Sequence, residues 1–190
     1  CFTCILRDEK LCPHANYIQP ILNAMLKADA LIFTTPVYVL SASGGMKAFL
    51  DHFGFMFYVH RARPEMFHKK AFILSTTAGA GTKSAMKTIA TSLKYWGINR
   101  VYSRGFVMHH IKWDAMPLKK KERYEKTLRT DAVKFFHAVS SQKPCAPYFN
   151  TRFMFFMIKK FQERAADDSV DKQYWKEQGW FGGVSPFHSK

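Results

Sequence analysis

The stretch ALIFTTPVYVLSASGGMKAFLDHF, residues 30–53, predicts the fold of this chain. It begins with a short apolar run at residues 30–33, which has the length and composition of a buried strand. We expect Thr34-Thr35-Pro36 to end that strand, because proline cannot donate to a ladder and restricts the residue before it. A loop of small and hydroxyl residues follows. It leads into an amphipathic helix whose apolar residues recur at helical spacing, namely Met46, Phe49, Leu50 and Phe53.

A second stretch repeats this arrangement. Residues 70–75 form another short apolar run, residues 76–82 a glycine-rich turn, and residues 83–96 an amphipathic helix that Gly97 ends. A third strand at residues 100–108 completes a β-α-β-α-β series. In an open α/β sheet, ligands bind where a strand gives way to the next helix, and the N–H groups of the helix start favour an acceptor-rich or anionic ligand. Any α/β domain needs short polar turns there, but a pair of such loops favours one shared ligand.

The composition indicates one folded domain with a high positive charge. The chain has 190 residues, 47% of them hydrophobic, which excludes a disordered chain. Its net charge of +15 suits nucleic acid, an anionic membrane surface or a phosphorylated ligand, although lysines spread along a chain usually form a solvated face. No nucleic-acid-binding motif is present, so we expect no nucleic-acid partner.

Cysteines and histidines offer candidate metal ligands. Cys1, Cys4 and Cys12 form a C-x-x-C pair with a third thiol eight residues on, a pattern that could hold a metal or an iron–sulfur cluster. A cubane cluster normally uses four thiolates, so we expect reduced structural cysteines in a cytoplasmic protein instead. The tandem pair His109-His110 would point to opposite faces of a strand, which argues against a joint metal site. Because the chain starts at Cys1 without an initiator methionine, we also expect it to begin inside a longer chain.

Three further segments complete the main domain, which we place at residues 1–142. Residues 16–28 predict a helix, and the aromatic residues 54–67 an irregular connection near the site, packed as a surface loop. Residues 118–141 predict a long charged helix. Its inward residues would be Tyr124, Leu128, Ala132, Phe135, Phe136 and Val139.

The remaining residues, 143–190, predict a helical extension. Residues 148–164 are basic and unusually aromatic, and a short helix follows at residues 171–180. The first segment could lie on an anionic membrane surface. We favour the alternatives, in which it caps the α/β core or covers a partner subunit.

The candidate site contains hydroxyl, glycine and aromatic residues and few acids. No Ser-His-Asp, Cys-His or paired-carboxylate arrangement stands out, so we expect no catalytic side chain. Such a site binds a planar, hydrogen-bonding ligand and leaves the reactive chemistry to that ligand.

The first loop resembles that of the flavodoxin-like NAD(P)H-dependent FMN oxidoreductases. Thr35-Pro36-Val37-Tyr38, then Ser41, Ser43 and the helix start Met46-Lys47-Ala48-Phe49-Leu50-Asp51 are similar to that family's P-V-Y, S and K-A-F-x-D segment. The C-x-x-C…C lead-in resembles its iron–sulfur flavoprotein relatives, and Thr76-Thr77-Ala78-Gly79-Ala80-Gly81 resembles its other isoalloxazine loop. The resemblance runs from Cys1 to about Val107.

This resemblance implies a flavodoxin-like three-layer α/β sandwich with a parallel sheet of order 2-1-3-4-5 and non-covalently bound FMN. The implied cofactor-binding residues are Thr35, Pro36, Val37, Tyr38, Val39, Ser41, Thr76, Thr77, Ala78, Gly79 and Gly81. Backbone N–H groups of Val37, Tyr38, Ala78 and Gly79 would bond the ring. Electrons would pass from NAD(P)H through the flavin to a quinone, a nitro or azo compound, free flavin or a protein. The family also implies a homodimer.

We expect one departure from the family pattern, and it concerns the N-terminus. The family's first strand, its phosphate-binding loop, first helix and second strand would lie upstream of the C-x-x-C, and this sequence has no counterpart for them. We therefore expect an exposed sheet edge and a weakened phosphate site. The alternatives are a flavin-free α/β binding or scaffold module, or an inactive truncated fragment.

Overall fold

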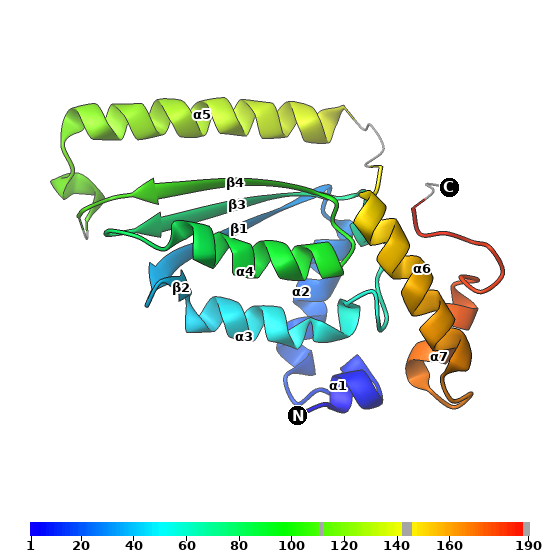
Figure 1. Cartoon of the computed structure of the whole chain (residues 1–190). Helices are drawn as coiled ribbons and strands as arrows, with labels where there is room; N and C mark the ends of the chain where they lie inside the picture. The colour runs from blue at the N-terminus through cyan, green and yellow to red at the C-terminus, as the bar shows by residue number, and fades with distance from the viewer. Residues whose placement is uncertain (111, 142–145, 188–190) are drawn as a thin grey trace.

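The chain forms three layers, with helices on both faces of a four-stranded sheet (Figure 1). The computed structural model describes residues 1–110, 112–141 and 146–187. Its helices are α1 (Thr3–Leu6), α2 (Ala15–Lys27), α3 (Gly44–His52), α4 (Thr82–Tyr95), α5 (Leu118–Ser140), α6 (Phe149–Arg164) and α7 (Val170–Glu177). Its strands are β1 (Ala30–Tyr38), β2 (Ser41–Ala42), β3 (Lys70–Thr77) and β4 (Arg100–Val107). Short 3-10 helices lie at Glu9–Leu11, Gly54–Met56, Pro64–His68 and Trp113–Ala115.

The sheet has the order β2-β1-β3-β4, and β1, β3 and β4 are parallel. Their starts are aligned, since Ala30 pairs with Lys70 and Lys70 with Arg100. The carboxyl ends of the three strands therefore lie together at one edge of the molecule, where both predicted ligand loops begin. This arrangement confirms the flavodoxin-like α/β fold that the sequence predicts.

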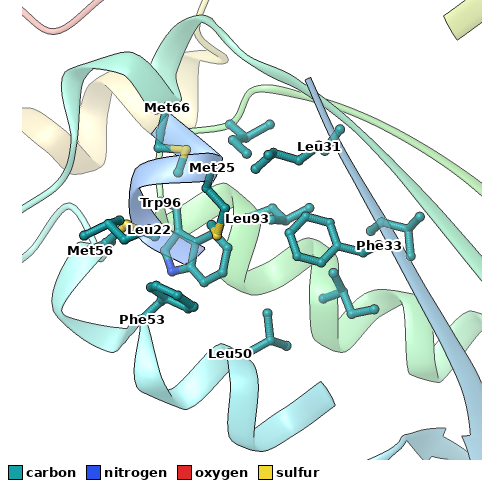
Figure 2. Packing of buried hydrophobic residues seen from close by; sticks show 14 of the residues in the cluster. Leu22, Met25, Leu31, Phe33, Leu50, Phe53, Met56, Met66, Leu93 and Trp96 are labelled. Carbon is teal, nitrogen blue, oxygen red and sulfur yellow. The ribbon is translucent and has the colours of Figure 1, made fainter. Parts of the chain in front are cut away.

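One face of the sheet carries the main hydrophobic core, under α2, α3 and α4 (Figure 2). Trp96, which is fully buried, lies at its centre, with its ring centroid 6.3 Å from that of Phe33 and 5.8 Å from that of Phe53. Leu22 of α2 and Leu93 of α4 lie beside it in the close view. The apolar side chains predicted from the helical spacing thus pack these helices against β1 and β3.

The opposite face is covered by α5, and only in part. Phe135 is buried against Phe72 and Tyr102, with ring centroids 5.6 Å from each. Leu128, Ala132 and Phe136 were predicted to point inward as well, but all three are exposed, Phe136 to 66%. An apolar groove of about 390 Å³ remains between α5 and β1. Phe136 lines it from α5, and the exposed Ile32 lines it from β1.

The predicted end of the first strand is wrong. β1 continues through Pro36 to Tyr38 and turns back as the short antiparallel strand β2, so a hairpin replaces the predicted loop. Proline is tolerated on edge strands, where its missing N–H disrupts no ladder. Apart from the two residues paired with β2, β1 has a strand neighbour on one side only among the described residues.

The connection at residues 54–67 is also placed differently from the prediction. It lies at the amino ends of the strands, opposite the two loops, and much of it is buried rather than on the surface (Figure 1). The C-terminal helices α6 and α7 cover it. Together they form what we call the amino-end cluster: Tyr58, Ala62, Phe67, Phe155, Ile158, Trp175 and Trp180. The expected surface loop is thus the base on which the C-terminal extension packs.

A buried arginine joins three distant segments beside this cluster. Arg61 is 3% exposed and donates to the carbonyl oxygens of Cys4 and Ile5, the latter at 3.2 Å. Its guanidinium also pairs with the carboxylates of Glu9 and Asp171. Two backbone carbonyl oxygens and the Glu9 carboxylate from the N-terminal segment therefore meet the Asp171 carboxylate of α7 at one charged group.

Candidate functional site

The two predicted loops touch each other at the carboxyl end of the sheet. Pro36 of β1 is in register with Thr76 of β3, so the loops leave the sheet side by side. Gly81, with φ of +101°, then packs against the β1-β2 hairpin. A Cβ added to it would lie 2.7 Å from the Cγ1 of Val37 and 2.9 Å from the Cα of Leu40. Glycine is required there both for the backbone conformation and for the close approach.

The tip of the hairpin is exposed and strained. Val39 and Leu40 both have positive φ, 48° and 59°, as a two-residue turn of this hand requires. Asparagine and glycine are usual there, whereas a β-branched valine in this conformation is an outlier. Val39 is 98% exposed and Leu40 is 63% exposed. Strain of this kind concentrates at functional sites, and here it holds apolar side chains in solvent beside the second loop.

Thr35 and Ser43 shape the first loop from beneath. Thr35 is 3% exposed, and its Oγ1 accepts from the backbone N–H of Ser43 at 3.2 Å. The Oγ of Ser43 in turn caps α3 by accepting from the N–H of Met46 at 3.2 Å. The Thr35 hydroxyl therefore positions the start of α3. Because it is buried and bonded in this way, it supports the loop from within and does not face solvent.

Thr77 shapes the second loop in the same way. Its Oγ1 donates to the carbonyl oxygen of Ala80 at 2.6 Å and accepts from the N–H of Gly79 at 3.3 Å. Ala78 and Gly79 are exposed, and a Cβ on Gly79 would meet no atom within 4 Å. The loop is thus held by a buried hydroxyl and presents small residues to open space.

The remaining predicted residues lie around these two loops. Pro36 and Tyr38 are exposed on the hairpin, and Val37, Ser41 and Thr76 are partly buried. The structure brings all eleven predicted residues to the same end of the sheet, with Thr35 and Thr77 buried beneath the others.

The end of β4 forms a third side of this site, which the sequence interpretation did not include. The backbone N–H of Met108 donates to the carbonyl oxygen of Thr77 at 2.7 Å, and that of His109 donates to the carbonyl oxygen of Ala78 at 3.2 Å. His109 has a φ of +58° and its side chain is exposed. The positive φ of His109 cannot be read from the sequence. Its place directly after a predicted parallel strand, however, was a signal that this residue lies at the same edge of the sheet as the two loops.

Titratable groups with shifted pKa values are prominent at the other end of the sheet. Burial, and then the neighbouring Tyr95, raises the pKa of Tyr58 to about 12. Burial lowers the pKa of Lys69, whose Nζ donates to the carbonyl oxygens of Leu26 and Ala28. These groups support packing at the amino ends of the strands. The loops offer backbone groups, hydroxyls and apolar surface, which suit a flat hydrogen-bonding ligand.

The cysteines do not form a metal centre with neighbouring ligands in the described part of the chain. Cys1, Cys4 and Cys12 are free thiols there, and no group of three histidine, cysteine or acidic side chains is arranged to hold a metal.

Comparison with known families gives a match that covers the site. The model of a family described as NADPH-dependent FMN reductase matches residues 2–112, which include β1 to β4 and both loops. No curated protein matches the chain. The matched range is more than half of the 190 residues and contains every residue of the candidate site. The chain therefore belongs to the NADPH-dependent FMN reductase family.

Proposed function

We propose that this protein is an FMN-dependent oxidoreductase that takes electrons from NAD(P)H. The acceptors proposed are a quinone, a nitro or azo compound, free flavin or a protein. The observation that carries the proposal is the contact of Gly81 with Val37 and Leu40, because it joins the two loops into one surface. NADPH as the reductant and reduced cysteines suit a cytoplasmic location.

The residues of this surface fit an isoalloxazine ring. Pro36 and Tyr38 offer exposed apolar surface on one side, and Ala78 and Gly79 leave room on the other. The N–H of Gly79 already donates to Thr77 at 3.3 Å, a long bond that a ring acceptor would compete for. Bound FMN supplies the ability to accept a hydride and release electrons, which no side chain here provides. The chain's own part is to orient the ring and to keep water from one face of it.

The first test is a visible absorption spectrum of the chain after incubation with FMN and desalting. We expect retained flavin bands that NADPH bleaches. A titration with riboflavin beside FMN separates ring contacts from phosphate contacts, because the two ligands share the ring and differ in the phosphate. A chain that stays colourless with both ligands would contradict the proposal.

A matched pair of variants locates the ring. Gly79→Val places a Cβ that would meet no atom within 4 Å and fills the open space of the second loop, so it should lower flavin affinity at least about tenfold while the fold survives. Gly182→Val makes the same change at an exposed glycine near the C-terminus and should leave the affinity unchanged. Equal affinities in the two variants would place the flavin elsewhere.

A homodimer stays a prediction from the family resemblance. Sedimentation equilibrium of the chain with and without FMN tests it, and a single species of 22.0 kDa in both conditions would contradict it.

A flavin-free binding module is the second candidate function. The observation that favours it is the edge of β1 that has no strand neighbour among the described residues before Val37, and that lies beside the apolar groove under α5. We propose that an extended segment with a following apolar helix would add to this edge as a strand and fill the groove. Protein that is colourless with FMN yet retains such a segment through gel filtration would favour this function over the first.

A further inference from the structure

Helix α6 is fixed to the body of the protein by one face. Its buried residues recur every three or four positions: Thr151, Phe155, Ile158 and Gln162. Phe155 stacks on Trp175 with ring centroids 4.8 Å apart, and the Nε2 of Gln162 donates to the carbonyl oxygen of Val59 at 2.7 Å. This inner face therefore sets the rotation of the helix about its axis.

The outer face of α6 is also apolar, and it is open to solvent. Phe149 is 79% exposed, Phe161 66%, Phe156 54% and Phe153 53%, and Met154 and Met157 lie among them. A surface helix normally presents polar residues on the side away from the core. Six large apolar side chains on the outer face of one helix therefore mark a contact surface.

The charges on α6 indicate what this surface contacts. Arg152, Lys159, Lys160 and Arg164 are its cations, against one acid, Glu163. Lys159 donates to the carbonyl oxygen of Phe181 at 3.1 Å and Lys160 pairs with Glu163 at 3.1 Å. Within the described residues, Arg152 and Arg164 form no ion pair. The outer face thus combines exposed phenylalanines with cations around them.

A second copy of the chain is a poor match for this face. Two copies joined by this face would bring the four cations of one α6 close to the four cations of the other, with one acid on each helix. A nucleic acid would match the charge, but aromatic platforms for single strands lie in basic grooves rather than along the outside of a helix. An anionic lipid surface matches both the charge and the apolar area.

We propose that the outer face of α6 docks the protein on an anionic membrane surface. The phenylalanines would lie at the boundary between headgroups and acyl chains, and the arginines and lysines would reach the lipid phosphates. In the described part of the chain, no helix is long and apolar enough to cross a bilayer. Docked by its outer face, α6 would lie in the plane of the interface. Figure 1 shows α6 at the amino ends of the strands, which leaves the two loops at the far end of the molecule.

The test is co-sedimentation of the full chain with vesicles of phosphatidylcholine, with and without phosphatidylglycerol. We expect binding that requires the anionic lipid and falls as salt rises. Binding to neither kind of vesicle at low salt would overturn the proposal. Because the readout is binding to lipid, its result is independent of whether FMN binds the loops.

Two pairs of variants separate this face from general charge and apolarity. Phe153→Ser with Phe156→Ser should lower the partition coefficient at least about tenfold. Val133→Ser with Phe136→Ser on α5 removes apolar residues that are also exposed and should leave the coefficient unchanged.

The second pair of variants tests the charges. Arg152→Gln, Lys160→Gln and Arg164→Gln together should lower the partition coefficient about a hundredfold. Lys119→Gln, Lys126→Gln and Arg129→Gln on α5 remove the same charge from exposed positions and should lower it far less.

Three results would contradict docking by α6. One is an equal loss in the α5 and α6 variants, which would indicate general adsorption of a basic protein. Another is a dimer in solution that Phe153→Ser with Phe156→Ser dissociates, with no vesicle binding, which would assign the face to a second copy. The third is salt-sensitive binding of single-stranded DNA that the same variants abolish, again without vesicle binding. Circular dichroism checks that each variant folds.

Discussion

The two ends of the sheet differ in how their side chains are used. At the carboxyl end, Val39 and Leu40 stand in solvent on a strained turn, and Thr35 and Thr77 hold the loops from below. At the amino end, Trp175 and Arg61 are buried, and they join segments that are more than 100 residues apart in the sequence. Buried contacts between distant segments stabilise the amino end of the sheet, whereas the carboxyl end leaves apolar side chains exposed to solvent.

This difference shows how the chain can keep an apolar, strained surface without unfolding. Strained turns persist only where the surrounding structure determines them. Here the hairpin is anchored by β1 and by the close approach of Gly81, while the free energy of folding comes from the core and the amino-end cluster. Variants at the two ends should therefore affect different measurements.

The largest effect is expected from Arg61→Leu. Removing the guanidinium leaves the largely buried carboxylates of Glu9 and Asp171 with only Arg63 and His60, respectively, as partners. The carbonyl oxygens of Cys4 and Ile5 also lose their donor, and the change should cost about 3 kcal/mol in the free energy of unfolding. Urea denaturation measures the cost, and FMN affinity of the folded variant should not change. Arg104→Leu removes a pair with Asp131 in which the arginine side chain is 40% exposed, and should cost less than about 1 kcal/mol. Equal losses in the two variants would contradict the special role of the amino end.

A smaller loss of stability with a large loss of binding is expected from Gly81→Ala. The positive φ and the contacts with Val37 and Leu40 should cost about 1–3 kcal/mol and push the two loops apart. Flavin titration should show at least about a tenfold weaker complex, because the joined surface is lost. Gly54→Ala, at a glycine whose Cβ would meet nothing within 4 Å, serves as the control for both measurements. An unchanged flavin affinity would separate the loops from flavin binding.

Ser43→Ala should remove about 1 kcal/mol, since the Oγ of Ser43 caps α3 directly below the first loop. Ser169→Ala changes the corresponding residue of α7, where the side chain makes no capping hydrogen bond, and should have almost no effect. Thermal unfolding of both variants measures the difference. A larger loss from Ser169→Ala would show that the cap does not support the carboxyl end.

The smallest effect concerns pH and the Arg104–Asp131 pair, which lies outside both ends. The hydrogen bonds from Arg104 hold the pKa of Asp131 below its ordinary value. The folded state therefore binds this proton less readily than the unfolded chain, so the stabilisation is present above the unfolded pKa of about 3.9. It is lost as the pH falls through the folded pKa. Urea denaturation at neutral and at acid pH should show the Arg104→Leu effect shrinking in acid, and a constant difference would contradict the linkage.

Local patterns predicted most of the elements. The apolar runs at β1 and β3 and the helical spacing of α2, α3 and α4 were sufficient for these elements, because each shows its own pattern in the sequence, and β4 was predicted as the third strand of the same series. The end of β1 was missed, since the local rule for Pro36 gives way when the strand lies at an edge and folds back on itself. Residues 54–67 were placed at the wrong end of the sheet, because they have no period and their partners are Phe155 and Trp175.

The sequence by itself determined the alternation of strands and helices, the two small-residue loops and the resemblance that the family match confirms. Only the tertiary structure decided that Gly81 touches the hairpin, that Arg61 joins three segments, and that α6 keeps an apolar face in solvent. The physical reason is that a period along the chain records which residues share a face of one element. Whether that face is covered depends on residues far away in the sequence, and folding alone brings them together.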